Sequence, residues 1–270
     1  MTSDSKTDYS VLDRPEVLMF LFHPRPESNR SNVQHSAQNV MIPVESGVEI
    51  GTRFHMTAET GPNILFFHGN GEIVADYDDL GPAYNQMGIN FLAADYRGYG
   101  RSSGQPTVGA MMKDCHAIFS FVKKWLLEKN YTGSLVVMGR SLGSASVLEL
   151  VDNYKNEIDG LIIESGFAYA TPLLQLLGIS PEALGFKEET GFRNIDKIRD
   201  FDKPTLIIHA ELDHIIPYSE GVALYNACAA SDKTLLKIPG ANHNDIFMRG
   251  FGEYLTAVKT LATKLIPDAA

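Results

Sequence analysis

Apolar runs of strand length alternate with longer amphipathic stretches over most of this chain. The strand-like runs are almost wholly apolar and cover residues 63–67, 90–95, 135–138, 161–163, 205–209 and 235–238. Helical patterns separate them, among them residues 71–87 and 107–129. Strands without a polar face that alternate with helices are typical of a mainly parallel sheet covered by helices on both sides. The predicted fold class is therefore α/β, with functional groups expected at the carboxyl ends of the strands.

The stretch at residues 107–129 shows the helical pattern most clearly. Its apolar side chains recur at steps of three and four residues: Val108, Met111, Cys115, Ile118, Val122 and Trp125. Such a stripe predicts a helix that covers one face of the sheet. Nearer the N-terminus, residues 40–44 and 48–55 have a strand pattern and are joined by residues 45–47 (ESG). This arrangement predicts an antiparallel hairpin at the sheet edge.

Two segments depart from the alternation and divide the chain. Residues 1–36 carry charged and proline-rich pieces around one short apolar segment, which predicts an N-terminal arm docked on the domain. Residues 37–270 form the α/β domain, in which an insertion at about 165–202 is predicted to be a small helical cap above the sheet. Within the insertion, Thr171 and Pro172 open a short leucine-rich helix at residues 173–177 that Gly178 ends.

The composition favours one globular domain and disfavours polyanionic partners. The chain has 270 residues, of which 44% are apolar, and a formal charge of −10. This length suits one α/β domain, and the negative charge repels nucleic acid and anionic membrane surfaces. Cys115 and Cys228 lie inside helical patterns, which predicts buried free thiols rather than a disulfide. The apolar run at residues 17–22 is too short for a signal sequence or a membrane span, so a cytoplasmic protein is expected.

Candidate chemistry is concentrated at residues 134–151. There an apolar strand pattern ends in residues 139–143 (GRSLG) and passes directly into a helical pattern. A serine at a sharp strand-to-helix turn projects its hydroxyl at the edge of the sheet, and the flanking glycines avoid clashes around it. Ser141 is therefore the candidate nucleophile. Residues 100–104 (GRSSG) fit the same pattern, but Pro106 prevents a helix from running straight through after Ser102, which favours a loop serine.

A serine hydroxyl needs a base that titrates near neutral pH, which among side chains is histidine. The histidines that follow Ser141 are His209, His214 and His243. His209 lies within a strand pattern, and His214 directly follows an acid candidate. His243 remains, in a loop after the last strand and ahead of the final helix.

The acid of such a site is expected just after the penultimate strand, one strand before the one that leads into the histidine loop. Asp213 occupies that place, where a carboxylate holds the tautomer of the imidazole and stabilises the imidazolium that forms. Glu164, after the preceding strand, is the alternative acid, and Glu211 is a more remote one.

Two backbone N–H groups are expected to bind the developing oxyanion. One is that of Leu142, at the N-terminus of the helix after the nucleophile. The other is expected from residues 68–72 (HGNGE), where the N–H of Asn70 is favoured and that of Gly71 is the second choice. His68 is predicted to brace this loop. Arg140 is expected to support the turn around Ser141 through backbone carbonyls, with a carboxylate as its alternative partner.

Together these motifs resemble the α/β-hydrolase superfamily, and within it the bud-emergence-type serine hydrolases related to the α/β-hydrolase-domain depalmitoylases. The likeness spans roughly residues 40–265 and rests on residues 68–71, 96–102, 139–143, 213–217 and 240–245. It implies the α/β-hydrolase fold, a triad of Ser141, Asp213 and His243, and cleavage of an acyl bond with no cofactor. The depalmitoylases carry a cysteine-rich N-terminus, and no such cluster precedes Cys115 here.

The predicted reaction is hydrolysis of a small-molecule acyl ester through an acyl-enzyme. An acyl thioesterase or a small-peptide amidase is the alternative among enzymes, because a triad does not by itself decide the leaving group. A non-catalytic binding or scaffold protein of the same fold is the hypothesis from another class. No metal site is expected, since no zinc-ligand spacing such as HExxH occurs.

Apolar residues in and beside the predicted cap have two interpretations. They would either line an acyl pocket or pack an amphipathic cap helix on the domain, and both roles need the same kind of side chain. These candidate substrate-binding residues are Phe167, Tyr169, Leu173, Leu176 and Leu177.

Overall fold

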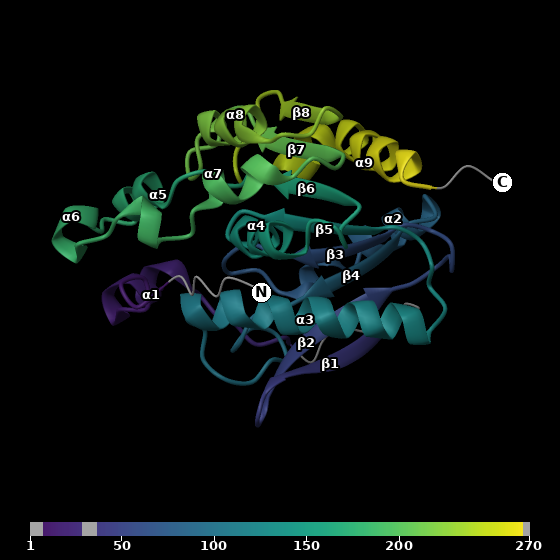
Figure 1. The fold of residues 1–270 in the computed structure, drawn as a ribbon, viewed down its shortest axis with the longest axis horizontal. Coiled ribbons are helices and arrows are strands. Elements are labelled where there is room, and N and C mark those ends of the chain that lie inside the picture. The colour runs from purple at the N-terminus through teal and green to yellow at the C-terminus, as the bar shows by residue number, and fades with distance from the viewer. Residues whose placement is uncertain (1–7, 29–36, 267–270) are drawn as a thin grey trace.

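An eight-stranded sheet runs through the molecule with the strand order β1-β2-β4-β3-β5-β6-β7-β8 (Figure 1). The computed structural model describes residues 8–28 and 37–266, so the parts of the predicted arm at residues 1–7 and 29–36 lie outside the described residues. The strands are β1 (Gln38–Glu45), β2 (Val48–His55), β3 (Asn63–Phe67), β4 (Asn90–Ala94), β5 (Leu135–Arg140), β6 (Gly160–Glu164), β7 (Thr205–Ala210) and β8 (Lys233–Ile238).

The pairing of the strands confirms the predicted mainly parallel sheet. The neighbours from β4 to β8 are all parallel, whereas β2 is antiparallel to both β1 and β4. The predicted hairpin is also present: Glu45 pairs with Val48 across a connection in which Gly47 has a φ of +75°. Glycine adopts this left-handed conformation without the clash that a Cβ would cause.

Successive side chains of β3 point to opposite faces of the sheet and enter two separate apolar cores. Leu65 and Phe67 belong to the core that contains residues of α3 (Val108–Glu128), α4 (Gly143–Tyr154) and α8 (Tyr218–Ala227). Ile64 and Phe66 belong to the core that contains residues of α2 (Leu80–Gln86) and α9 (Ile246–Lys264). Helices therefore cover both faces, which explains why every residue of β3 to β7 is buried.

The helix predicted at residues 71–87 is wrong in its first half. Gly71 has a φ of +76° and Ile73 is extended, so helical structure starts only with a 3-10 turn, η1 (Val74–Tyr77), followed by α2. The carboxylate of Asp76 accepts a hydrogen bond from the N–H of Ile73 at 3.0 Å. This contact stabilises the N-terminus of η1 at Val74. Residues 68–73 therefore form a loop at the carboxyl end of β3.

The inserted segment after β6 contains several short helices. They are α5 (Ala170–Leu176), α6 (Pro181–Leu184), η2 (Glu188–Thr190), α7 (Asn194–Lys197) and η3 (Ile198–Asp200). In Figure 1, α5 and α6 extend to the left of the sheet, whereas α7 lies over the body near α8. Lys197 in α7 forms an ion pair of 2.5 Å with Glu149 in α4, which fixes the returning end of the insertion.

The described part of the N-terminal arm contains a helix that the apolar run at residues 17–22 did not predict. This helix, α1 (Pro15–Leu21), begins at a proline and buries Val17 and Leu21. Just before it, a carboxylate oxygen of Asp13 accepts hydrogen bonds from the N–H groups of Val108 and Gly109, at 2.6 and 3.2 Å. The arm therefore caps the N-terminus of α3, where the orphan N–H groups and the helix dipole favour a negative charge.

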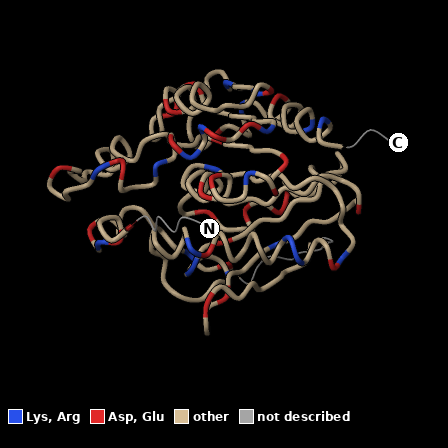
Figure 2. Tube along the Cα trace, viewed as in Figure 1, with Lys and Arg blue, Asp and Glu red and all other residues tan. Residues whose placement is uncertain are grey.

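Charged residues of both signs are interspersed over most elements in the view of Figure 2. Among the helices of residues 8–28 and 37–266, none is both long and apolar enough to cross a lipid bilayer.

Candidate active site

A sharp turn joins β5 to α4 and carries Ser141. This residue has a φ of +51°, an uncommon backbone conformation for a residue with a side chain. The glycines on either side make the turn possible, because a Cβ at Gly139 would lie 2.4 Å from the carbonyl oxygen of Gly143, and one at Gly143 would lie 2.1 Å from that of Phe67. Strand, turn and helix therefore meet as the GxSxG spacing predicts.

The turn brings Ser141 to two side chains from distant loops. The Nε2 atom of His243 lies 3.0 Å from the Oγ atom of Ser141, and its Nδ1 atom lies 2.7 Å from a carboxylate oxygen of Asp213. His243 follows β8 and Asp213 follows β7, so parallel strands deliver all three groups to one edge of the sheet. All three residues are buried, with exposed fractions between 4% and 8%.

The carboxylate of Asp213 is held in its charged form. Burial raises its pKa, but the hydrogen bond and charge of His243 and the N–H groups of Ile215 and Ile216 together lower the pKa below its ordinary value. Those N–H groups donate to the second carboxylate oxygen at 3.0 and 2.8 Å. Asp213 is therefore held as an anion beside the imidazole of His243.

The other two histidines that follow Ser141 are placed differently. His209 is fully buried in β7, with its Nε2 atom 2.8 Å from the carbonyl oxygen of Ile216, and burial lowers its pKa. His214 is exposed. Within the described residues, the imidazole at hydrogen-bond distance from the hydroxyl of Ser141 is that of His243.

The chain is similar in sequence to known proteins. The family described as serine aminopeptidase, S33, matches residues 58–185. Alpha/beta hydrolase domain-containing protein 17B of Homo sapiens is 30% identical over 210 residues, which cover 74% of this chain and 66% of that protein. The chain belongs to the α/β-hydrolase superfamily. The prediction of this family is thereby confirmed, and the similarity supports the prediction of a hydrolase enzyme.

Solved structures agree with this α/β-hydrolase fold. The Pyrococcus furiosus esterase Pf2001 has a TM-score of 0.73 at 19% identity, covering 91% of this chain and 99% of that one. Est1E from Butyrivibrio proteoclasticus, solved with ferulic acid bound, has a TM-score of 0.68 at 19% identity, covering 84% and 99%. The chain of this α/β-hydrolase spans 59% to 66% of the length of the curated relatives it matches.

The two predicted oxyanion donors, Leu142 and Asn70, follow the neighbouring strands β5 and β3. Leu142 directly precedes the first residue of α4, so its N–H belongs to the helix N-terminus, where the dipole favours negative charge. Asn70 lies in the loop after β3, and Phe67 at the end of β3 is the register partner of Gly139. The loop of Asn70 and the turn of Ser141 thus start from adjacent strand ends.

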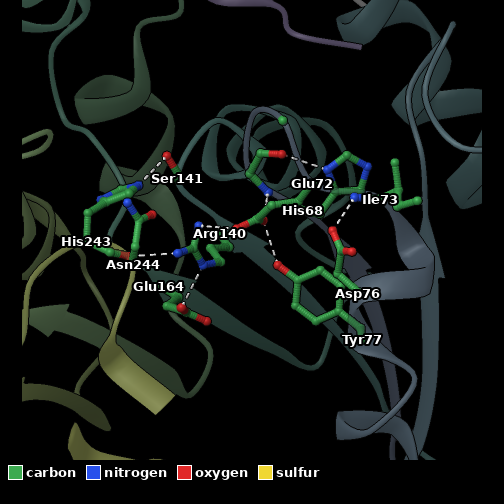
Figure 3. A network of polar contacts seen from close by, with 12 residues as sticks. His68, Glu72, Ile73, Asp76, Tyr77, Arg140, Ser141, Glu164, His243 and Asn244 are labelled. Carbon is green, nitrogen blue, oxygen red and sulfur yellow. Dashed lines mark hydrogen bonds and ion pairs between the residues drawn. The ribbon is translucent and has the colours of Figure 1, made fainter. Parts of the chain in front are cut away.

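Arg140 links the two sides of the site, as Figure 3 shows. Its guanidinium forms ion pairs with Glu72 at 2.7 Å and Glu164 at 3.0 Å, and donates to the carbonyl oxygen of His243 at 2.7 Å. Glu72 in turn accepts a hydrogen bond of 2.7 Å from the N–H of Gly69. One buried cation therefore holds both the loop of His243 and the loop of Asn70. The pattern GRSLG marked Arg140, but nothing in the sequence pattern assigned a role to Glu72.

The alternative acid, Glu164, is bound to groups other than the imidazole. Its two carboxylate oxygens bind Arg140 and accept a hydrogen bond of 2.9 Å from the hydroxyl of Tyr254, and burial raises its pKa. Glu211, the remoter alternative, pairs with Lys237 at 2.7 Å on the surface. Of the three acids considered, Asp213 is the one that accepts a hydrogen bond from His243.

Two further residues singled out in the sequence support loops. The Nδ1 atom of His68 lies 2.7 Å from the carbonyl oxygen of Gly69, and its Nε2 atom lies 3.2 Å from a carboxylate oxygen of Asp95. The imidazole thus links the loop after β3 to the carboxylate of Asp95. The hydroxyl of Ser102 accepts a hydrogen bond of 2.9 Å from the N–H of Gly51, so this serine of the second GxSxG motif ties a loop to β2.

The five candidate substrate-binding residues have different environments. Phe167 is buried and packs edge-on against Phe192, with ring centres 5.3 Å apart. Leu173 and Leu177 are half-buried against the core of α3, α4 and α8. Tyr169 and Leu176 are exposed, at 39% and 52%.

Arg140 also lines a cavity of about 360 Å³. It is bounded by elements of the α2 and α9 face, and the residues that line it include Glu72, Tyr77, Leu80, Asn244, Phe247 and Phe251. Asn244 directly follows His243, so the cavity lies next to the histidine loop. None of the five candidate residues of the insertion lines it.

Proposed function

We propose that this hydrolase cleaves a small-molecule acyl ester through an acyl-enzyme on Ser141, with His243 as base and Asp213 as the acid that orients it. One observation carries the proposal: a buried chain of hydrogen bonds runs from the hydroxyl of Ser141 through both ring nitrogens of His243 to Asp213. This is the geometry that activates a serine, since nucleophile, base and orienting group are each within hydrogen-bond reach of the next.

In the first half of the reaction, the Oγ atom of Ser141 attacks the carbonyl carbon while the Nε2 atom of His243 takes its proton. The N–H groups of Leu142 and Asn70 donate to the tetrahedral oxyanion. The imidazolium then gives its proton to the alkoxide oxygen as the ester bond breaks, and the alcohol leaves. In the second half, His243 deprotonates a water that attacks the acyl-enzyme. The imidazolium then returns this proton to the Oγ atom of Ser141 as the acyl bond to the serine breaks, and the acid is released.

The apolar part of the substrate has two proposed sites. The cavity beside Asn244 lies within the size range of small-molecule sites, about 300–1,000 Å³, and Phe247 and Phe251 give it aromatic walls. The insertion residues Tyr169 and Leu176 are the other site, because their exposure leaves them free to contact a substrate. Phe251→Ala and Leu176→Ala separate the two: the change at the true site raises KM for long acyl chains more than for acetyl.

Similarity supports an ester as substrate and also an amide. Pf2001 is named an esterase, whereas the matched family is described as a serine aminopeptidase. Ester hydrolysis is the first proposal, cleavage of a small-peptide amide is the second, and thioester cleavage is the third. A cytoplasmic location is proposed with them.

The test is hydrolysis of p-nitrophenyl esters of increasing acyl length, alongside acyl thioesters and amino-acid p-nitroanilides. His243→Ala is compared with His214→Ala, a matched change at an exposed histidine. We expect ester turnover by the wild type and by His214→Ala, and a loss of at least about 10³-fold in His243→Ala. If the anilides are turned over and the esters are not, an amide rather than an ester is the substrate. Equal turnover by His243→Ala and His214→Ala would contradict the assignment of His243 as the base.

A further inference from the structure

The described end of the N-terminal arm reaches the loop of Asn70. The backbone N–H of His23 donates a hydrogen bond of 2.8 Å to the side-chain oxygen of Asn70, and the hydroxyl of Tyr99 donates to the same oxygen at 2.7 Å. The side-chain nitrogen of Asn70 lies 2.8 Å from the Nδ1 atom of His23. Both ends of the amide are therefore bound, and His23 contacts each of them.

The next residue of the loop is held by the same arm. The Nε atom of Arg25 donates a hydrogen bond of 2.7 Å to the carbonyl oxygen of Gly71, and its guanidinium also forms an ion pair with Asp76. Packing does not fix the loop at this point, because a Cβ at Gly71 would have no atom within 4 Å. Hydrogen bonds from the arm, together with that from Tyr99, therefore restrain the outer side of the loop.

The arm itself is anchored well enough to act as a fixed support. Its backbone exchanges two hydrogen bonds with Gly100, one from Gly100 to Arg25 at 2.9 Å and one from Glu27 to Gly100 at 3.1 Å. Glu27 also pairs at 2.7 Å with Arg53, whose side chain is fully buried. A buried ion pair resists separation because removing one partner leaves an uncompensated charge.

We propose that His23 is a positioning residue for the oxyanion site, acting through the side chain of Asn70. The inference rests on the proposed function, in which the N–H of Asn70 binds the oxyanion. Glu72 holds the loop from inside through Gly69, and residues 23–25 hold it from outside. Glu72 and residues 23–25 together fix the position of the N–H of Asn70. A shift of about 1 Å in such a group lowers the rate by up to about 10²-fold.

The test compares His23→Ala and His23→Asn with Met19→Ala, a control in the same arm whose side chain is 64% exposed. Rates are divided by the concentration of active sites titrated with a phosphonate, so that loss of folded protein does not register. In His23→Ala we expect kcat to fall by about 10-fold to 100-fold with KM within about twofold. His23→Asn should restore most of kcat, because its amide oxygen replaces Nδ1 as the hydrogen-bond acceptor. Met19→Ala should have the kcat of the wild type.

A positioning role also predicts two effects that a structural role would not produce. Affinity for a trifluoromethyl ketone, which forms a tetrahedral oxyanion on the serine, should fall in proportion to kcat/KM. Asn70→Ala keeps its own N–H but loses the contact with His23, so adding His23→Ala to it should have almost no further effect. If His23→Ala does not fold, Asn70→Ala alone must show the same loss of kcat.

Unchanged kcat per titrated site in His23→Ala and in Asn70→Ala, with an active wild type, would overturn the positioning role and leave the proposed function intact. Additive losses in the double variant would overturn the route through Asn70. A wild type with no titratable serine would overturn the proposed function and this inference together.

Discussion

Two buried carboxylates lie near the imidazole of His243, and their surroundings give them different tasks. Hydrogen bonds from His243 and from two backbone N–H groups lower the pKa of Asp213, whereas burial raises that of Glu164. Asp213 binds the ring directly, while Glu164 binds Arg140 and Tyr254. Groups whose environments shift their pKa values in opposite directions are suited to different roles. Under the proposed function, Asp213 orients the base, and Glu164 supports the cation that holds the loop of the base.

This division of roles predicts unequal effects of removing the two charges. Asp213→Asn leaves the shape intact but favours the wrong imidazole tautomer, so kcat should fall by about 10³–10⁴-fold, whereas Glu164→Gln should keep it within about tenfold. Both are measured as ester hydrolysis per folded protein, with circular dichroism to confirm the fold. A loss in Glu164→Gln as large as in Asp213→Asn would contradict the assignment of Asp213.

At the scale of elements, α3, α4 and α7 meet at one side chain. Glu149 in α4 lies 3.2 Å from His116 in α3 and 2.5 Å from Lys197 in α7. Burial raises the pKa of Glu149, but these two partners lower it more, from 4.5 to about 2. The folded protein therefore holds this carboxylate charged more strongly than the unfolded chain does.

The shift predicts how Glu149 contributes to stability as the pH changes. Because the pKa is lower in the folded state, the contribution is full above pH 4.5 and is lost as the pH falls toward 2. A shift of this size corresponds to about 3 kcal/mol of the free energy of unfolding. Urea denaturation of Glu149→Gln should show most of this loss at pH 7 and a smaller deficit at pH 3. An equal deficit at both pH values would contradict the account.

The elements differ in how far the sequence predicted them. The apolar strands and the helix at residues 107–129 were predicted within a few residues. A strand that is buried on both faces gives a continuous apolar run, and a helix that is buried along one stripe gives apolar residues at steps of three and four. The helix at residues 71–87 was not, since the left-handed Gly71 and the extended Ile73 keep residues 68–73 as a loop. Residues 17–22 gave no helix prediction because the apolar run is too short for a period to emerge.

The candidate site was predictable where order along the chain carries the information. A nucleophile turn, an acid and a histidine that follow successive strands are brought together by any parallel sheet, and the structure places Ser141, Asp213 and His243 within hydrogen-bond reach. The supports were not predictable in the same way. Arg140 to Glu72 and His23 to Asn70 are contacts between loops far apart in the sequence, and no local pattern records them.

At the scale of the whole molecule, the sheet separates two apolar cores and gathers the reactive groups at one edge. Both cysteines are free and buried in the core of α3, α4 and α8, as predicted, and burial raises the pKa of the Cys115 thiol. The thiols are therefore shielded from reagents in the folded chain. Under the proposed function, reaction with a serine-directed electrophile should thus be confined to one serine per molecule.

The most direct test of the account is labelling of the full chain with a fluorophosphonate, after iodoacetamide treatment, with the modified residue located by mass spectrometry. We predict one label per chain, on Ser141, absent from Ser141→Ala and retained in Ser102→Ala. A label on Ser102, or no label on a folded wild type, would contradict an activated serine at the turn between β5 and α4.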